Sequence, residues 1–294
     1  MRLAMRVSAR IAGAGGALAA LTLLAGCAAS TPYRTRVLAF DAPGVDAGAG
    51  TVLGSDPDEL RIAQVVAQVI RERLRLPFPP DTTVRVYVNQ ATFAAGLVQD
   101  DSHVSDEAWD RARVAVAVAS PRGLFLRGDL MSSMRVLDRV GVIAHELAHV
   151  NQMEMRRGGR GVPAQWIREG HADWVKYQVQ DLLGMRPYSE SREEVKRAIL
   201  RSATPIRFFP PLNELSRGDR WTDASVRLGW GATYGQAFLA IDWLVERYGI
   251  ERLNAFSRRF AGNEPPRSHW AAVFGVEYAE FVSQARARLE QLGG

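Results

Sequence analysis

Hydrophobic residues recur at helical spacing along several stretches of this chain. The clearest stretch spans residues 134–150, where apolar side chains return every three or four positions. These positions are Val136, Leu137, Val140, Ile143, Leu147 and Val150. Such spacing predicts an amphipathic helix with one buried face.

Other segments are also predicted to be helical. Pro163 stands just before a second helical stretch, and proline favours the first turn of a helix. Asn89 can cap a short helix that ends near Val98. Further helices are expected at about 56–76, 191–202, 232–248, 250–260 and 278–292.

Alternating and β-branched residues predict a small amount of sheet. Residues 83–88 have the pattern of a strand. Residues 114–119 and 124–127 flank the turn sequence SPRG and indicate a β-hairpin. We therefore expect an α+β, mostly helical fold. Residues 56–162 would form a small N-terminal lobe with a mixed sheet, and residues 163–294 a helical C-terminal lobe.

The N-terminal segment has the pattern of an export signal. Arg2, Arg6 and Arg10 precede an apolar run over residues 11–26 that is too short for a comfortable membrane span. The sequence LAGC at residues 24–27 resembles a bacterial lipobox. In a lipobox the cysteine thiol carries a lipid, and cleavage before the cysteine makes it the new N-terminus.

This resemblance implies that residues 1–26 are removed and that a lipid on Cys27 anchors the protein in the bacterial cell envelope. By resemblance to enterobacterial lipoproteins, Ala28 in place of aspartate favours the outer membrane, facing the periplasm. An ordinary signal peptide with an incidental cysteine is the alternative. Residues 27–55 are rich in Ala, Gly, Pro and Asp, so a flexible tether is expected after the lipidated cysteine.

Composition narrows the possible functions. The chain has 294 residues and one cysteine, so no intramolecular disulfide can form. Three of its 37 basic residues lie in the signal, and the remaining 34 face 32 acidic residues, which lowers the net charge from +5 to about +2. The remaining arginines are scattered among acids, so no nucleic-acid partner is expected.

The 134–150 helix carries an HExxH motif formed by His145, Glu146 and His149. Residues four apart share a helix face, so both imidazoles can point at one metal ion. Glu146 lies about 100° round the helix and is placed to reach a metal-bound water. A catalytic zinc takes three protein ligands and keeps one position open. Glu169, 20 residues after His149, is the expected third ligand.

Asp173 follows Glu169 by four residues and therefore shares its helix face. It can accept the spare ring N–H of a zinc-bound histidine, with His145 the expected partner, and so fix the ring. Two other interpretations stay open. A buried ion network without metal would leave buried charge poorly compensated. A structural zinc site usually has four protein ligands, often including cysteine.

The sequences HELAHVNQ at 145–152 and WIREGHADWV at 166–175 resemble the gluzincin metallopeptidases, the thermolysin-like group. They are most similar to the peptidase MA-like family of bacterial envelope proteins, over about residues 114–249. The resemblance implies a zincin-like fold for residues 56–294, one Zn²⁺ per chain, and hydrolysis of a peptide or protein substrate. Glu146 would be the general base.

Gluzincins also use a tyrosine or histidine from a later helix to stabilise the oxyanion. Tyr234 matches that position, in a stretch that runs into the sequence RYG at 247–249. Packing in a helical core is the alternative role for Tyr234. His269 is a second candidate donor, although its proline-flanked stretch indicates a surface residue.

The remaining histidines fit a metal role less well. His171 lies about 200° round the helix from Glu169, so it should point away from the metal. His103, close to Asp100 and Asp101, is interpreted as a surface-loop residue rather than a second metal site. Most tryptophans fit core positions, but Trp230 can line a cleft beside Tyr234.

Two functions are compatible with these residues. The first is a lipid-anchored zinc peptidase, in which the 114–119 edge strand would hold extended peptide by main-chain pairing rather than merely cap the sheet. The second is a zincin-fold binding or assembly module without turnover. We call His145, His149 and Glu169 the metal group. If Tyr234 and this strand lie close to the metal group, the enzyme is favoured over the binding module. The GxMEN segment of gluzincin aminopeptidases is absent, which disfavours an aminopeptidase and leaves endopeptidase or exopeptidase action open.

Overall fold

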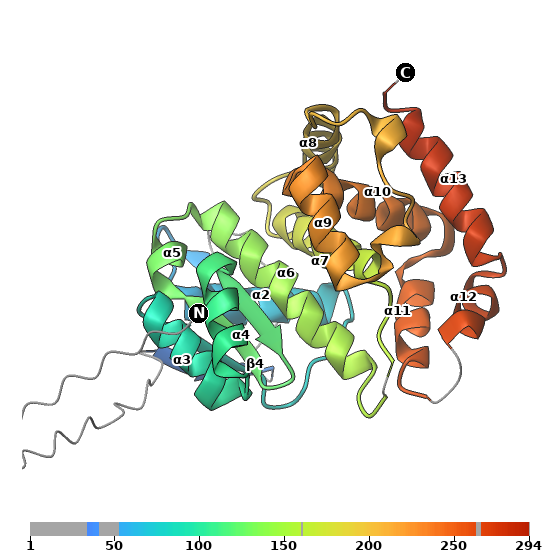
Figure 1. Cartoon of the computed structure of the whole chain (residues 1–294). Coiled ribbons are helices and arrows are strands. Elements are labelled where there is room, and N and C mark those ends of the chain that lie inside the picture. Colours follow the sequence, from blue (N-terminus) through green and yellow to red (C-terminus); the bar gives the residue numbers. More distant parts are fainter. Residues whose placement is uncertain (1–33, 41–52, 160, 263–265, 294) are drawn as a thin grey trace, which may run out of the picture.

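The computed structural model describes residues 34–40, 53–159, 161–262 and 266–293 (Figure 1). The predicted signal peptide, residues 1–26, and Cys27 lie outside these residues. Within the described part of the chain, no helix combines the length and apolar character needed to cross a membrane.

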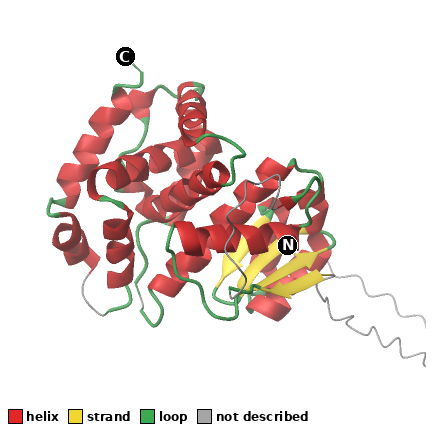
Figure 2. Ribbon diagram, turned by 180° about the vertical axis from the view of Figure 1, so that it is seen from behind, coloured by secondary structure: helices red, strands yellow, loops and turns green. Residues whose placement is uncertain are grey.

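Four strands form one mixed sheet at one end of the molecule (Figure 2). They are β1 (Arg34–Val37), β2 (Thr83–Tyr87), β3 (Ala117–Ser120) and β4 (Gly123–Arg127). The order is β1-β2-β4-β3, in which β2 and β4 are parallel and the other two pairs antiparallel. The predicted hairpin is confirmed as β3 and β4, and β3 is an edge strand of the sheet.

Helices make up most of the described chain, so the predicted α+β, mostly helical class is confirmed. They are α2 (Glu59–Arg73), α3 (Gln90–Asp101), α4 (Ser105–Val114), α5 (Gly128–Ser132), α6 (Val136–Met155), α7 (Gln165–Leu182), α8 (Tyr188–Leu200), α9 (Gly218–Leu228), α10 (Trp230–Tyr248), α11 (Ile250–Arg259), α12 (Pro266–Phe274) and α13 (Tyr278–Glu290). Two 3₁₀ turns, η1 (Ile206–Phe208) and η2 (Glu214–Ser216), precede α9.

The sequence pattern misses α4, α5, α9 and α12. In α4 only Ala108 and Ala112 are buried, so the helix has no wide apolar face to recognise. Because α4 extends to Val114, the first strand of the hairpin begins at Ala117 instead of residue 114. Asn89 caps α3 as predicted, with its side chain accepting from Thr92 N–H at 3.0 Å.

The prediction of a flexible tether over residues 27–55 is wrong for the part that the structure describes. Residues 34–37 form β1, which pairs antiparallel with β2. Leu38 and Leu53 are buried in the core, and Arg34 forms ion pairs with Asp58 and Glu59 of the α2 N-terminus. These residues are therefore fixed in place by strand pairing and by burial of their side chains, although the composition of the surrounding segment is typical of a linker.

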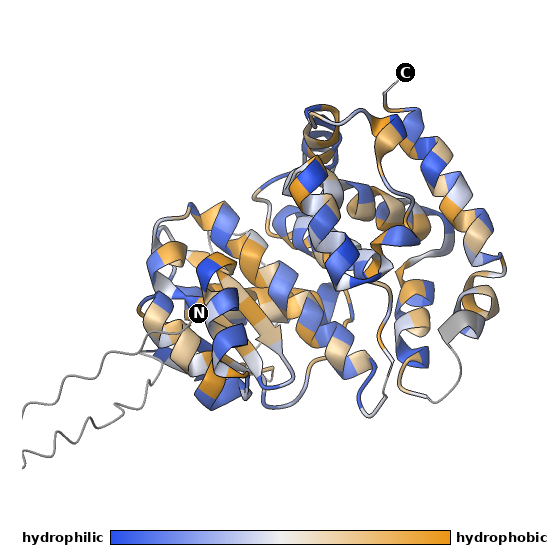
Figure 3. Cartoon of the chain, in the orientation of Figure 1, coloured by the Kyte–Doolittle hydropathy of each residue, from blue (hydrophilic) through white to orange (hydrophobic). Residues whose placement is uncertain are grey.

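Three helices that pack in sequence position the HExxH motif. α6 packs against the sheet and α2 on one side and against α7 on the other, and α7 packs against α10 (Figure 1). Gly170 allows the last contact, because a Cβ there would lie 2.4 Å from the Ala237 carbonyl oxygen. Figure 3 shows hydrophobic and hydrophilic residues alternating along α6 and α13, as expected for helices with one buried face.

Candidate metal centre and cleft

Two helices bring three potential metal ligands to one point. α6 supplies His145 and His149 from one face, and α7 supplies Glu169. One ligand atom from each lies within 4.8 Å of the other two, so the group can hold a metal ion. The two imidazoles are 14% and 15% exposed, so they are largely desolvated but still open to a cavity.

The two distances from Glu169 to the imidazole nitrogens fit the edges of a coordination tetrahedron. Glu169 Oε2 lies 3.3 Å from His145 Nε2 and 3.5 Å from His149 Nε2. Metal–ligand bonds of about 2.1 Å at tetrahedral angles place neighbouring ligand atoms about 3.4 Å apart. Direct hydrogen bonds between charged groups are shorter, about 2.7–2.9 Å. The geometry therefore suits three ligands of a common ion better than a directly bonded ion network.

Asp173 orients His145, as predicted. Its Oδ1 lies 2.9 Å from His145 Nδ1 and 3.3 Å from Lys176 Nζ. Burial opposes a charge on His145, but the interactions of the ring with the carboxylates of Asp173 and Glu169 outweigh it and raise the pKa of the imidazole to about 10. Burial likewise opposes ionisation of Asp173, yet Lys176 and His145 lower its pKa. The pair fixes Nδ1 on the aspartate side and leaves Nε2 facing Glu169.

Gln152 plays the matching role for His149, which the sequence reading missed. Its Oε1 lies 3.0 Å from His149 Nδ1. Its Nε2 donates to the Arg168 carbonyl at 2.9 Å and lies 3.2 Å from His171 Nδ1. The sequence signal was available, because Gln152 follows His149 by three residues and shares its helix face.

His171 is not one of the ligands, as predicted from its position on α7. It is buried, and its ring stacks on Trp174 at 6.4 Å between centroids. Burial and the nearby His149 lower the pKa of His171 to about 4, so the ring is neutral. Gln152 links His171 to His149 by its two side-chain contacts.

Glu146 lies beside the ligand group without joining it. Its Oε2 accepts a hydrogen bond from the backbone N–H of Ala119 in β3 at 2.9 Å. Burial raises the pKa of this carboxyl despite the opposing effect of His149 and His145. By contrast, the pKa of Glu169 lies well below its usual value, because the two histidines outweigh the effect of burial. The two carboxyl groups therefore have different proton affinities.

Tyr234 comes from α10 to the same place. Its ring lies 6.0 Å from that of His145 and packs edge-on against Trp221 at 4.9 Å. Burial and the nearby Glu169 raise the pKa of the phenol, so it remains a hydrogen-bond donor. Trp230 is 56% exposed, with its ring 6.0 Å from Tyr234.

A cavity of about 590 Å³ joins these features. Its lining includes the three ligand residues, Glu146, Tyr234, Gln152 and the β3 residues Ala117, Val118 and Ala119. Trp230 is outside this lining, so the suggestion that it lines the cleft is not supported. The sequence thus identified residues from α6, α7, α10 and β3 that the fold brings to a single cleft.

The other histidines lie elsewhere. His269 was expected at the surface, but it is 1% exposed within α12 and its ring packs edge-on against Phe260 at 4.8 Å. The helix that carries it, α12, packs on α11. It does not line the cleft, which removes it as a second oxyanion donor. His103 pairs with Asp101 at 3.0 Å, away from the metal group.

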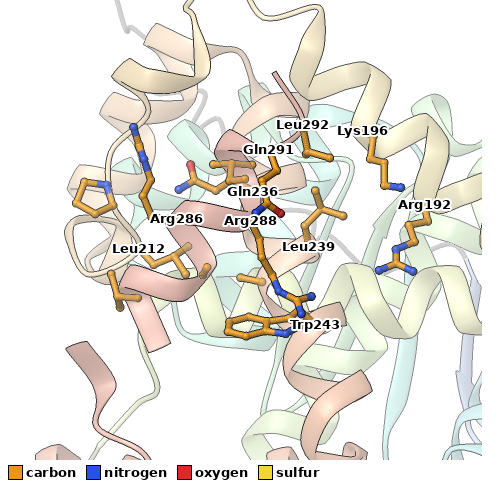
Figure 4. A pocket seen from close by; sticks show the side chains of 15 residues that line it. Arg192, Lys196, Leu212, Gln236, Leu239, Trp243, Arg286, Arg288, Gln291 and Leu292 are labelled. Atoms are coloured by element: carbon orange, nitrogen blue, oxygen red, sulfur yellow. The ribbon is translucent and has the colours of Figure 1, made fainter. Parts of the chain in front are cut away.

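A second cavity, of about 460 Å³, lies between α8, α10 and α13, and none of the metal-group residues lines it. Figure 4 shows Arg192 and Lys196 on one side of it and Trp243 at its base. Most of the basic side chains that line this cavity form ion pairs with acidic residues. Arg192 contacts Asp242 and Glu246, each at 2.8 Å.

Comparison with protein-family models, with curated proteins and with solved structures found no match to this chain. The interpretation of the site therefore depends on its own geometry.

Proposed function

We propose that this chain is a lipid-anchored zinc peptidase of the bacterial cell envelope, with a zincin-like, gluzincin-type active site. One observation carries the proposal. His145, His149 and Glu169 each bring one ligand atom within 4.8 Å of the other two, with Glu169 Oε2 at 3.3 and 3.5 Å from the imidazole nitrogens, and Glu146 lines the same cavity.

The donor set suits zinc. Two imidazole nitrogens and one carboxylate oxygen match a three-ligand catalytic site with an open position. The second nitrogen of each imidazole already has a partner, Asp173 or Gln152, which is the usual support for a metal-bound histidine. Zinc bound by these three residues would supply Lewis-acid chemistry, lowering the pKa of a bound water and polarising a carbonyl.

Glu146 is the proton carrier. Its carboxylate takes a proton from the attacking water and delivers it to the leaving amine. The raised pKa of Glu146 brings its proton affinity closer to that of the groups it serves. The Ala119 N–H that binds Oε2 holds the carboxylate in place. The low pKa of Glu169 keeps that residue ionised as a ligand.

The edge strand β3 offers a main-chain binding site. Val118 pairs with Phe125 of β4, while Ala119 directs its N–H away from β4 to Glu146. Ala117, two residues earlier, has the same orientation because side and main chains alternate along a strand. An extended peptide can hydrogen-bond to this edge beside the metal group.

Tyr234 completes the site as an oxyanion donor. Its phenol is held by Trp221 and stays protonated. A positioned O–H can donate to the developing negative charge of the tetrahedral intermediate.

A binding module without turnover would not need this arrangement. β3 and Tyr234 both line the cavity that holds the metal group, and this favours hydrolysis over simple binding. The location in the envelope rests on the lipobox resemblance alone. Replacement of Cys27 by serine should abolish lipid labelling in a bacterial host and release the protein from membranes.

Metal content tests the site first. Mass spectrometry of the full chain should find about one zinc per chain, and Glu169→Ala should lose it or bind it far more weakly. Glu146→Gln should keep zinc and lose hydrolysis of a peptide mixture. A wild-type chain that takes up no zinc at neutral pH, or a fully active Glu146→Gln, would overturn the proposal.

A further inference from the structure

Three arginines line the cleft that holds His145, His149 and Glu169, and none of them has an acidic partner in the part of the chain that the structure describes. Arg111 belongs to α4, Arg156 follows the last turn of α6, and Arg168 lies in the first turn of α7. Among the described residues, none of the three forms an ion pair with a carboxylate. The acidic residues that line the cleft are Glu146 and Glu169.

Arg156 and Arg168 also lie close enough to repel one another. Burial and the positive charge of Arg168 both lower the pKa of Arg156. The hydrogen bond from Arg156 to the Gly161 carbonyl is 3.5 Å long, at the outer limit for such a bond. Two partly buried like charges with so little compensation favour an anion between them.

The N-terminus of α7 adds to the positive potential. Ala164, the residue before α7, provides no side-chain cap, and its neighbours Pro163 and Gln165 line the cleft. The first amide groups of a helix carry a partial positive charge when no side chain caps them.

A bound metal does not neutralise this charge. Glu146 and Glu169 together balance one divalent cation, and neutral histidines add nothing. The three guanidinium groups then remain uncompensated. The second cavity differs, since Arg192, Lys196 and Arg286 there each contact a glutamate or aspartate.

We propose that the cleft selects acidic peptide segments, with Arg156 and Arg168 as the specificity-determining residues and Arg111 assisting at the α4 side. This inference rests on the proposed peptidase function and adds a substrate class to it. Carboxylate side chains of an extended peptide on β3 would form charge-assisted hydrogen bonds with the guanidinium groups.

The spacing along α6 limits where the acidic residues sit. Arg156 follows His149 by seven residues, which corresponds to about 10 Å along a helix axis. An extended peptide advances about 3.3 Å per residue. We therefore expect preferred Asp or Glu residues within about three positions of the cleaved bond.

Cleavage of a randomised peptide mixture, read by mass spectrometry, identifies the preferred position. Matched peptides with Glu, Gln or Lys there should then show kcat/KM about tenfold higher for Glu than for Gln, and lower still for Lys. Arg156→Gln with Arg168→Gln should bring the rates for the Glu and Gln peptides within about twofold of each other, because the Glu peptide loses its charge-assisted contacts.

Two controls separate recognition from damage. Arg135→Gln removes an exposed arginine at the opposite end of α6 and should leave the Glu preference unchanged. Arg156→Lys retains the charge and should retain a preference for Glu. If the double variant loses zinc, the single variant Arg156→Gln provides the test, because Arg156 is not adjacent to a ligand residue. This variant must still lower the preference for the Glu peptide over the Gln peptide.

Binding distinguishes the failure of this inference from the failure of the peptidase proposal. Fluorescence anisotropy with Glu146→Gln should show tighter binding of the Glu peptide than of the Gln peptide, weakening with added salt. Selective binding without cleavage by wild type would overturn the peptidase but support acidic recognition. Cleavage with equal rates for Glu and Gln peptides, unchanged by the arginine substitutions, would overturn the acidic preference alone.

Discussion

Gln152 holds His149 from the side opposite Glu169, with 3.0 Å between Gln152 Oε1 and His149 Nδ1. The amide oxygen can only accept, so Nδ1 carries the proton and Nε2 keeps its lone pair for a metal. The amide nitrogen of Gln152 in turn donates to the Arg168 carbonyl at 2.9 Å. One side chain thus sets the tautomer of a ligand on α6 and ties it to α7.

Removing this support should weaken zinc binding. Gln152→Ala is expected to lower zinc affinity by about 10- to 100-fold, because His149 loses the partner that orients it. Gln152→Glu retains the acceptor and should bind zinc more tightly than Gln152→Ala. Competition with a chelator of known affinity measures the change. Gln180→Ala is the matched control, because it removes another hydrogen bond between α7 and α6, from Gln180 to the Leu137 carbonyl, far from the ligands. If Gln180→Ala weakens zinc binding as much as Gln152→Ala does, the proposed role of Gln152 is refuted.

Asp173 should make the stability of the metal-free protein depend on pH. The folded pKa of His145, about 10, exceeds its ordinary value of 6.5. The stabilisation is therefore complete below pH 6.5 and is lost as the pH rises towards 10. Asp173→Asn removes one cause of the raised pKa, so its stability should fall less over this range.

Urea unfolding of metal-free protein at several pH values measures this effect. Parallel stability curves for wild type and Asp173→Asn would contradict the prediction. Zinc affinity should rise with pH, whereas the stability of the metal-free protein falls. The reason is that zinc competes with the proton on His145, so the affinity rises until that proton is lost.

Tyr234→Phe removes the phenolic O–H and little of the ring packing. We expect kcat to fall by about 100- to 1,000-fold, the usual effect of losing one oxyanion donor. KM, zinc content and thermal stability should stay close to wild type, since the ring still contacts Trp221. Steady-state kinetics on the best peptide provide the measurement, and an unchanged kcat would exclude Tyr234 from catalysis.

Two glycines test the packing of α7 on α10. Gly170→Ala would place a Cβ 2.4 Å from the Ala237 carbonyl oxygen, and we expect a loss of about 1–3 kcal/mol as the helices separate. Gly231→Ala, near the start of α10, meets only Ala198 Cβ at 3.6 Å. Because alanine favours helices, that variant should be as stable as wild type or up to about 1 kcal/mol more stable. Thermal unfolding of the two variants measures this difference. Equal stability of both would show that the contact between α7 and α10 can adjust to the added methyl group.

Local spacing made the candidate metal ligands predictable. His145 and His149 share a face of α6 because a helix repeats every 3.6 residues, and the same period pairs Glu169 with Asp173 on α7. The hairpin was equally readable, because a turn sequence separated two apolar strands. These features depend on contacts between residues close in sequence, and a pattern records such contacts directly.

Contacts between distant segments were not readable in this way. β1 is held by pairing with β2, almost 50 residues later, while its neighbours in sequence resemble a linker. Burial of His269 against Phe260 and the link from Gln152 to His171 depend on which helix faces meet. The pattern of one segment does not specify its partner.

By itself, the sequence determined the chemistry of the ligands, the helices that carry them and the mostly helical class. Only the tertiary structure decided that three arginines, without an ion-pair partner among the described residues, would share the cleft with those candidate ligands. Arg111, Arg156 and Arg168 are scattered among acids along the chain, and their charges combine only when α4, α6 and α7 pack together. Electrostatic potential depends on distances in space, which helical periodicity does not fix between elements.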